Sequence, residues 1–175
     1  MPAAYYTYLI SSLPGLVFGA EPPISFEEFL ENCHPLIPQK DFEILRGASL
    51  EAVDIYRGMQ PTLKEWREFD TTLRNELVKI RAGRKKIDPL KYLRRDGYAE
   101  PHISHTTLNA YRNPSLLEAE RALDLERWRV LEELSAGHYF DIDFLIAYAH
   151  KLLILERWQK INSADKVQQL EALLK

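Results

Sequence analysis

The sequence has little of what a disulfide-stabilised or strongly basic protein requires. Its 175 residues include one cysteine, Cys33, which cannot form an internal disulfide and is typical of proteins in a reducing compartment. The apolar neighbours of Cys33 predict a buried thiol. The net charge is −3, which argues against a surface adapted as a whole to nucleic acid.

The sequence also lacks a long uninterrupted apolar run. His150 and Lys151 interrupt its most apolar segment, residues 144–155, whereas a membrane-spanning helix needs roughly 18 or more apolar residues. The tyrosine-rich N-terminal segment has no basic residues of the kind that begin a secretory signal peptide. We therefore expect a cytoplasmic protein that does not insert into a membrane.

Motifs of the common enzyme classes are missing. The sequence contains no nucleophile elbow, P-loop, dinucleotide fingerprint or His-Glu-x-x-His element. Its acidic neighbours Glu27-Glu28 and Glu132-Glu133 would point in different directions on a helix, so they do not form catalytic carboxylate pairs. We therefore expect a protein without catalytic activity, cofactor or bound metal.

Two histidines have the spacing of a metal-binding element. His102 and His105 would lie on one face of a helix, with Glu100 nearby. A zinc site needs a third or fourth ligand, and the sequence offers no cysteine or carboxylate-rich partner. We interpret the pair as surface histidines, and a metal-dependent enzyme that uses both is our third functional hypothesis.

What the sequence does contain is apolar residues at helical spacing. Hydrophobic residues make up 46% of the chain, so we expect a folded core and an all-α fold. Ser25 begins a capping box and predicts a helix over about residues 26–33. Thr62 and Glu65 form a second capping box, which predicts an amphipathic helix that ends at Gly83.

Other segments carry weaker patterns. Residues 5–10 form a short apolar run that periodicity cannot assign to a strand or to a helix. We predict two short helices around Gly47 and a final short helix capped by Ser163. Residues 96–113 contain glycine, proline and a threonine pair, which predict a loop. The chain is expected to form a single domain over residues 1–175, or one that is divided near this loop.

The C-terminal part predicts a long antiparallel hairpin of two helices. Pro114 is expected at the first helical position of residues 114–135. The second helix, residues 141–161, is apolar on nearly every face, so we expect Leu145 and Tyr148 to be deeply buried. A short glycine-containing link favours antiparallel packing of the two helices. The predicted fold is therefore an all-α helical bundle with a long C-terminal antiparallel helix hairpin.

The densest charge cluster lies between residues 79 and 95, where Asp88 is the only acid among eight basic residues. The helix macrodipole favours cations near a helix C-terminus, but it accounts for only some of them. A solvated face, a docking surface for an acidic protein and a site for nucleic acid or lipid headgroups all fit. Only Tyr92 and Tyr98 are at hand to stack on bases. The predicted partner-binding residues are Arg84, Lys85, Lys86, Arg94 and Arg95.

Three segments resemble a known family. They are residues 5–9, residues 113–121 and residues 138–158, which read Tyr-Tyr-Thr-Tyr-Leu, Asn-Pro-Ser-Leu-Leu-Glu-Ala-Glu-Arg and His-Tyr-Phe-Asp-Ile-Asp-Phe onward to Trp158. Together they resemble a bacterial family of unknown function whose members are encoded among the subunits of V-type (archaeal-type) rotary ATPases. The resemblance implies V-type ATPase subunits as partners and a place at the membrane periphery through that complex.

A second resemblance points to the same machine. Residues 142–148 and Lys151 are similar to a segment of the C subunit of those ATPases, called the d subunit in eukaryotes. That resemblance implies a stalk component, which requires shape and charge complementarity and no chemistry. Our first hypothesis is therefore a non-catalytic protein-binding subunit or assembly factor of a V-type ATPase. The alternative is a nucleic-acid-binding module that uses residues 79–95.

Overall fold

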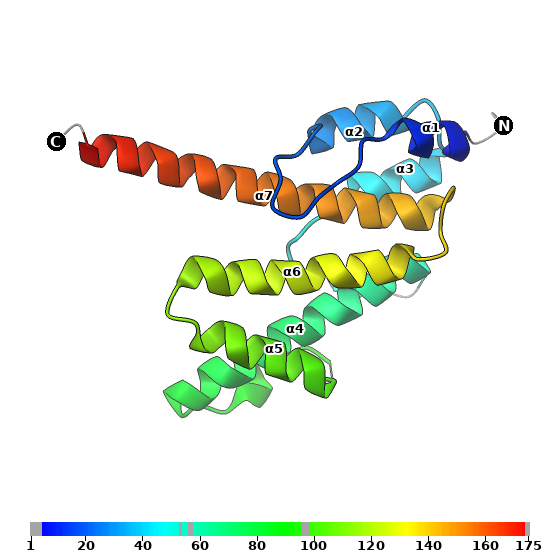
Figure 1. Cartoon of the computed structure of the whole chain (residues 1–175). Helices are drawn as coiled ribbons and strands as arrows, with labels where there is room; N and C mark the ends of the chain where they lie inside the picture. The colour runs from blue at the N-terminus through cyan, green and yellow to red at the C-terminus, as the bar shows by residue number, and fades with distance from the viewer. Residues whose placement is uncertain (1–4, 53, 56–57, 96–98, 174–175) are drawn as a thin grey trace. The chain divides into compact units, whose positions relative to one another are not determined.

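All regular secondary structure in the described part of the chain is helical. The computed structural model describes residues 5–52, 54–55, 58–95 and 99–173. Over these residues the chain forms seven α-helices and one short 3-10 helix, which confirms the predicted all-α class (Figure 1). The elements are α1 (Tyr6–Ser12), α2 (Phe26–Cys33), α3 (Gln39–Arg46), α4 (Pro61–Lys85), η1 (Pro89–Lys91), α5 (Pro101–Arg112), α6 (Leu116–Ser135) and α7 (Ile142–Leu173).

The helices form two compact units. The first comprises Met1–Leu50 and Leu131–Lys175, and the second comprises Glu51–Val130. The predicted division near residues 96–113 lies inside the second unit. That the whole chain is one domain stays a prediction. None of the described helices combines the length and the apolarity that a membrane crossing requires.

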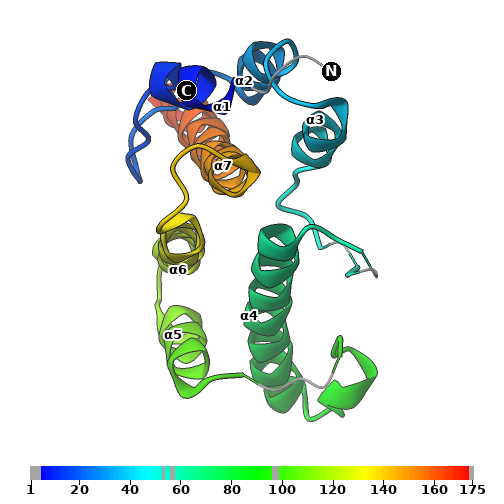
Figure 2. The ribbon, with the colours of Figure 1, turned by 90° about the vertical axis from the view of Figure 1, so that its right-hand side faces the viewer.

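Helix α7 is the centre of the first unit. Both α2 and α3 pack against it, and Figure 2 shows them around α7, which is viewed nearly end-on. Leu145 has no exposed surface and Tyr148 is 6% exposed, which confirms the predicted burial of both side chains. The Tyr148 ring stacks on Phe29 at 5.3 Å between centroids, and its hydroxyl donates to the carbonyl of Pro14 at 2.9 Å.

The N-terminal segment that the sequence left open is a helix. The hydroxyl of Tyr6 donates to Asp41 of α3, and the backbone amide of Tyr5 donates to the carbonyl of Leu36 at 2.9 Å. Leu9 is fully buried. Helix α1 is therefore held by the first unit through both polar and apolar contacts.

Cys33 closes α2 inside the same unit. Its thiol is fully buried, as predicted, and burial raises the pKa of Cys33 to about 12. Helix α2 begins as predicted, because the Ser25 hydroxyl accepts from the amide of Glu28 at 3.0 Å. Its first amide, that of Phe26, donates to the carboxylate of Glu156 in α7 at 2.7 Å.

The second unit contains an apolar cluster shared by three helices. Leu73 of α4 and Ile103 and Ala110 of α5 lie in it, together with residues of the first turns of α6. Helix α5 also packs directly against α4. The cluster is completed by Ala119, Leu123, Phe69 and Leu77.

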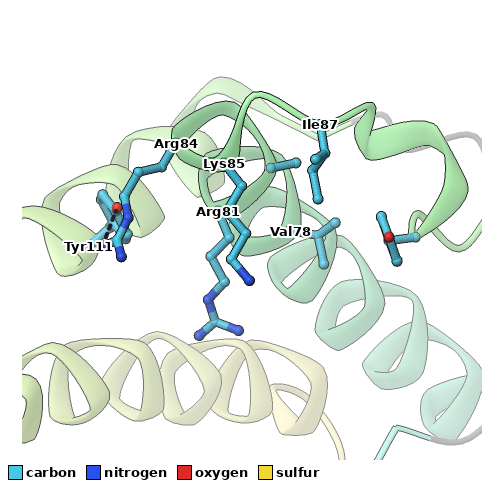
Figure 3. A pocket seen from close by; sticks show the side chains of 8 residues that line it. Val78, Arg81, Arg84, Lys85, Ile87 and Tyr111 are labelled. Atoms are coloured by element: carbon cyan, nitrogen blue, oxygen red, sulfur yellow. Dashed lines mark hydrogen bonds between the residues drawn. The ribbon is translucent and has the colours of Figure 1, made fainter.

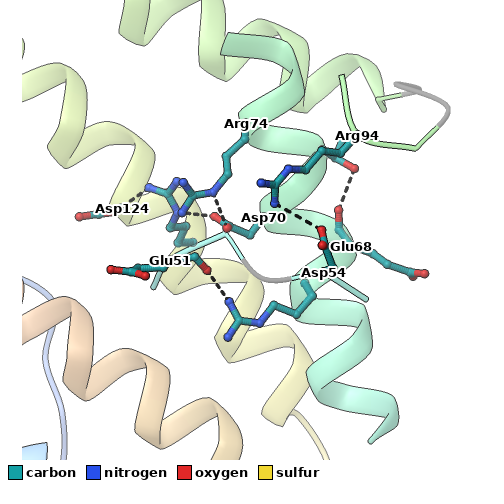
Figure 4. Close-up of polar contacts among 10 residues, drawn as sticks. Glu51, Asp54, Glu68, Asp70, Arg74, Arg94 and Asp124 are labelled. Carbon is teal, nitrogen blue, oxygen red and sulfur yellow. Dashed lines mark hydrogen bonds and ion pairs between the residues drawn. The ribbon is translucent and has the colours of Figure 1, made fainter. Parts of the chain in front are cut away.

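A buried ionic network joins α4 to α6 beside this cluster. The Arg127 guanidinium lies 2.9 Å from Asp70 and 2.8 Å from Asp124, and Arg74 contacts the other oxygen of Asp70 at 2.7 Å (Figure 4). The side chains of Asp70, Asp124 and Arg127 are at most 8% exposed. Burial alone lowers the pKa of Arg127, but Asp70 and Asp124 outweigh it, so the pKa is raised and the ionised form is favoured.

The predicted loop over residues 96–113 is wrong for most of its length, because α5 occupies it. Pro101 lies in the first turn, where its missing amide costs no hydrogen bond. Ile103, Thr107 and Ala110 then face the core at helical spacing. The threonine hydroxyl donates to the carbonyl of Ile103 at 2.9 Å, so a residue typical of loops is satisfied inside a helix.

The ends of α4 differ from the prediction. Gln60 and not Thr62 caps the helix, since its side chain accepts from the amide of Leu63 at 2.7 Å. Gly83 does not end the helix either. The left-handed residue that ends it is Lys86, at φ 54°.

Three other helix boundaries also need correction. No second helix follows Gly47 in the described residues 48–52, 54–55 and 58–60. Helix α6 is capped by Ser115, whose hydroxyl accepts from the amide of Glu118 at 3.3 Å, so Pro114 precedes the helix. Ser163 does not begin a new helix, because its hydroxyl donates to the carbonyl of Gln159 inside a continuous α7 at 2.8 Å.

The two helices of the predicted hairpin are both present. Asp141 caps α7 by accepting from the amide of Phe144 at 3.1 Å. Lys151 of α7 lies 3.7 Å from Glu132, which places the last turn of α6 beside α7. The rest of α6 belongs to the second unit, so antiparallel pairing along the whole length stays a prediction.

The central position of α7 predicts a large cavity penalty. Leu145→Ala is expected to lower the free energy of unfolding by about 2–5 kcal/mol, because no surface of this side chain is exposed. Val17→Ala is the control, since Val17 is 66% exposed. Denaturant melts compare the two variants, and similar small losses for both would contradict the central position of α7.

The buried ionic network predicts that removing Arg127 destabilises the protein more than removing an exposed arginine. Arg127→Met removes the shared cation and leaves Asp124 and Asp70 in the interior, so unfolding should cost about 3–5 kcal/mol less. Arg129→Met is the matched control, because the Arg129 side chain is 61% exposed beside Glu126. An exposed pair of this kind contributes at most about 1 kcal/mol. Equal losses in denaturant melts would show that the network does not hold the second unit together.

Candidate functional site

A basic pocket lies at the C-terminal end of α4, within the second unit. It has a volume of about 500 Å³ and is bounded by α4, the segment that follows it and Tyr111 of α5 (Figure 3). We call it the α4–α5 pocket. Its lining residues are Val78, Arg81, Ala82, Arg84, Lys85, Ile87, Tyr92 and Tyr111.

The cations of the pocket come from the last two turns of α4. Arg81 and Lys85 are four residues apart, so they project from the same face of the helix, as Figure 3 shows. Arg84 points toward α5, and its guanidinium donates to the hydroxyl of Tyr111 at 3.4 Å. Cations at this position are also favoured by the negative end of the helix dipole.

The apolar part of the pocket follows from how α4 ends. The amide of Lys86 donates to the carbonyl of Gly83 at 3.2 Å, and that of Ile87 donates to Ala82 at 3.1 Å. These two bonds form a Schellman motif, which usually has glycine at the left-handed position that Lys86 occupies here. The turn brings Ile87 back over α4, where it is 44% exposed at the pocket.

Tyr92 is positioned at the pocket by the short helix η1. Asp88 accepts from the amide of Leu90 at 3.0 Å and so caps η1. Tyr92 follows η1 directly and is 59% exposed. Leu90 is more exposed still, at 74%. Apolar side chains on solvent beside a pocket are typical of interaction surfaces.

The charge of this pocket is uncompensated within the described part of the chain. Among those residues, no carboxylate lies within ion-pair distance of Arg81, Arg84 or Lys85. Lys86, which is exposed, adds a fourth cation beside them. The pocket is therefore suited to an anionic group with an apolar part.

A second pocket adjoins the first. It has a volume of about 290 Å³ and shares Arg81 and Tyr111 with the α4–α5 pocket. We call it the α5–α6 pocket. Its lining includes Leu116, which is 78% exposed, and the carboxylate-bearing Glu120. The remaining lining residues are Leu77, Ala110, Asn113, Pro114, Ala119 and Leu123.

The five predicted partner-binding residues divide into two groups. Arg84 and Lys85 line the α4–α5 pocket, and Lys86 follows them. Arg94 and Arg95 follow η1, lie beside the middle of α4 and each form an ion pair with an acid of the same unit. Arg94 lies 3.8 Å from Asp54, and Arg95 lies 2.7 Å from Glu68.

Backbone contacts explain this division. The amide of Arg94 donates to the side chain of Asn75 at 3.0 Å, and its carbonyl accepts from the same side chain at 2.7 Å. The segment after η1 is thereby held against the middle of α4 (Figure 4). The sequence predicted one surface for the five cations because the contact between Arg94 and Asn75, which brings the chain back to α4, is not evident from the sequence.

Sequence reasoning also missed Arg81 and Tyr111. Arg81 is one of the eight basic residues between residues 79 and 95, but it was not among the predicted partner-binding residues, although its four-residue spacing to Lys85 places both on one helix face. Tyr111 lies on a segment that was predicted as a loop, so nothing along the sequence joined it to α4. Tyr98, the second expected stacking residue, lies outside the described residues.

In the described residues, the histidines singled out by spacing are not part of a group of three or more metal-ligating side chains. His102 lies 3.4 Å from Glu100 and 4.0 Å from Glu126, and His105 contacts Asn109 at 3.2 Å. Both histidines are exposed on α5, as surface histidines should be.

Another group in the described residues does gather metal-ligating atoms. His138, Asp141 and Asp143 each offer a ligand atom, and these atoms lie within 4.8 Å of one another. The His-x-x-Asp-x-Asp spacing was the available sequence signal. However, Asp141 caps α7, and its other carboxylate oxygen lies 2.7 Å from Nδ1 of His138. The structure of the helix start therefore explains why these side chains lie together.

The contact between His138 and Asp141 predicts a raised pKa for this histidine. The hydrogen bond with Asp141 raises the pKa of His138 above its usual 6.5. The protonated form of His138, paired with Asp141, therefore stabilises the folded protein. This stabilisation is complete below pH 6.5 and is lost as the pH rises through the higher pKa of His138 in the folded protein. An NMR titration should find the raised pKa, and Asp141→Asn, which still caps the helix, should lower it. An unchanged pKa in that variant would contradict the pairing.

Comparison with known proteins gives one match. Residues 105–173 match a family of proteins of unknown function, DUF2764. The match covers less than half of the 175-residue chain. DUF2764 similarity includes Tyr111, Leu116 and Glu120 of the two pockets, whereas Arg81–Tyr92 lies outside it. No curated protein and no solved structure matches the chain.

Proposed function

We propose that this chain is a non-catalytic protein-binding subunit or assembly factor that docks an acidic partner at the end of α4. The observation that carries the proposal is the uncompensated charge of Arg81, Arg84 and Lys85 around a pocket with apolar and tyrosine walls. Arginine and tyrosine are enriched where protein interfaces concentrate their binding energy. Lys86 extends the same positive surface.

A protein partner fits this surface better than nucleic acid. The whole chain carries a net charge of −3, and only 8 of its 23 lysine and arginine residues lie between residues 79 and 95. Arg94 and Arg95, which would lengthen a track for a phosphate backbone, are already paired with Asp54 and Glu68. Nucleic-acid binding through residues 79–95 is the alternative function.

The resemblance to proteins encoded with V-type ATPase subunits supports a specific partner. The match to a family of unknown function over residues 105–173 includes two segments of that resemblance, residues 113–121 and 138–158. We accordingly propose V-type ATPase subunits as partners, with the chain at the cytoplasmic periphery of the membrane complex.

Removing the positive charge at the end of α4 should slow association. In the triple variant, Arg84, Lys85 and Lys86 become glutamine, which avoids placing acids at the negative end of the α4 dipole. Association with purified V-type ATPase subcomplexes at low salt should slow about tenfold, because long-range attraction is lost. High salt should remove most of the difference by screening the charges.

The matched control removes three cations from the first unit. Lys40, Arg46 and Lys160 are exposed and become glutamine in the control variant, which should associate nearly as fast as wild type. Equal rates for the triple variant and wild type at low salt would leave the α4 surface as a solvated face. Salt-dependent binding of an oligonucleotide, without binding of any ATPase subunit, would favour the alternative.

A further inference from the structure

We propose that the α4–α5 pocket receives an apolar side chain from an acidic segment of the partner, whose carboxylates are bound by Arg81, Arg84 and Lys85. This inference rests on the proposed protein-binding function and specifies the chemistry of what is bound. It treats the pocket as a site for a short peptide motif, and not only as a charged surface.

The walls of the pocket require an apolar group. Val78 and Ala82 of α4, Ile87 of the Schellman turn and the rings of Tyr92 and Tyr111 all line it. A volume of about 500 Å³ falls in the usual range of ligand pockets, about 300–1,000 Å³. A carboxylate alone would leave these apolar walls in contact with water, whereas an apolar side chain would cover them.

The backbone around the pocket disfavours a phosphate compound. Phosphate sites commonly use helix N-termini or free amides of a glycine-rich loop. Here the helix end is a C-terminus, and the amides of Lys86 and Ile87 are consumed by the carbonyls of Gly83 and Ala82. The positive charge is carried by side chains alone. Arginine side chains bind carboxylates through paired hydrogen bonds, which fits acidic residues on either side of an apolar anchor.

The adjoining α5–α6 pocket extends the motif. Because it shares Arg81 and Tyr111 with the first pocket, one bound segment can cross both. Leu116 offers an exposed apolar contact there, but Glu120 lines the same pocket and would repel an acid. We therefore expect two apolar anchors, with the acidic residues gathered around the one in the α4–α5 pocket. An amphipathic helix presents anchors in this way.

The experiment is an unbiased selection for short peptides on the full-length protein. A display library of random peptides is selected against wild type, and synthetic versions of the enriched peptides are measured by fluorescence anisotropy. The expected peptides carry two apolar residues, with aspartate or glutamate beside one of them. Enriched peptides without acidic residues, or no enrichment at all, would overturn the inference.

Variants then locate the binding site. Arg81→Gln should weaken the enriched peptides about tenfold or more, because a charged hydrogen-bonding partner is lost. Leu116→Gln should weaken them through the second pocket, with little risk to folding at a residue that is 78% exposed. Arg112→Gln is the matched control, since this exposed cation lines neither pocket. Circular dichroism verifies that each variant is folded, and unchanged affinities in both test variants would overturn the inference.

Competitors separate the other occupants. Inorganic phosphate, ATP, an oligonucleotide and vesicles of anionic phospholipid are each added to the peptide complex. Displacement by one of them at lower concentration than by unlabelled peptide would assign the pocket to that ligand and overturn the inference.

The outcome is distinguishable from that of the proposed function. If ATPase subcomplexes bind but Arg81→Gln and Leu116→Gln leave that binding unchanged, the inference fails and the ATPase assignment stands. If acidic peptides bind as expected but no ATPase subunit does, the ATPase assignment fails and the peptide site stands.

Discussion

The second unit depends on the burial of two carboxylates around one guanidinium. Asp70 of α4 and Asp124 of α6 both contact Arg127, and Arg74 covers the remaining oxygen of Asp70. Charges this far from water are tolerated only when each has its partners in place. Unlike apolar contacts, such pairs have a narrow range of acceptable geometry. The network therefore sets the register of α4 against α6, and the apolar cluster around Leu73 fills the space beside it.

Fixing that register positions the pockets. Arg81 and Tyr111 face a common opening because α4, α5 and α6 are held together further along, at Asp70 and in the apolar cluster. The end of α4 itself is governed by local rules. The left-handed Lys86 reverses the chain and returns Ile87 to the helix. A rigid scaffold thus carries a surface made from a helix end and a turn, which is where binding residues commonly lie.

How much of this could be predicted depends on the range of the interactions concerned. The central place of α7 followed from its own apolar pattern, because a helix without a polar face must be covered. Ser25 could be recognised as a cap because its bond spans three residues, whereas Asp141 was expected only as the start of a helix. Helix α5 was missed although Ile103, Thr107 and Ala110 share a face. Proline, histidine and threonine are common in loops, and only the packing against α4 outweighs that preference.

The site shows the same limit more sharply. Arg84 and Lys85 were found because charge density is visible along the sequence. Their separation from Arg94 and Arg95 depends on Asn75, which bonds the returning backbone across nineteen positions. Tyr111 lines the pocket only because α5 packs against α4. A run of like charges therefore located the surface but could not define which of its members act together.

The state of Cys33 has a practical consequence for spectroscopy. Its thiol is buried and its pKa is raised to about 12, so it holds almost no thiolate at neutral pH and reacts slowly with alkylating reagents. It is also the single cysteine of the sequence. A cysteine introduced at an exposed position in each unit, such as Val17 and Leu116, can therefore carry a spin label or a fluorophore in the otherwise native chain. Distances between such labels would report on the arrangement of the two units in solution.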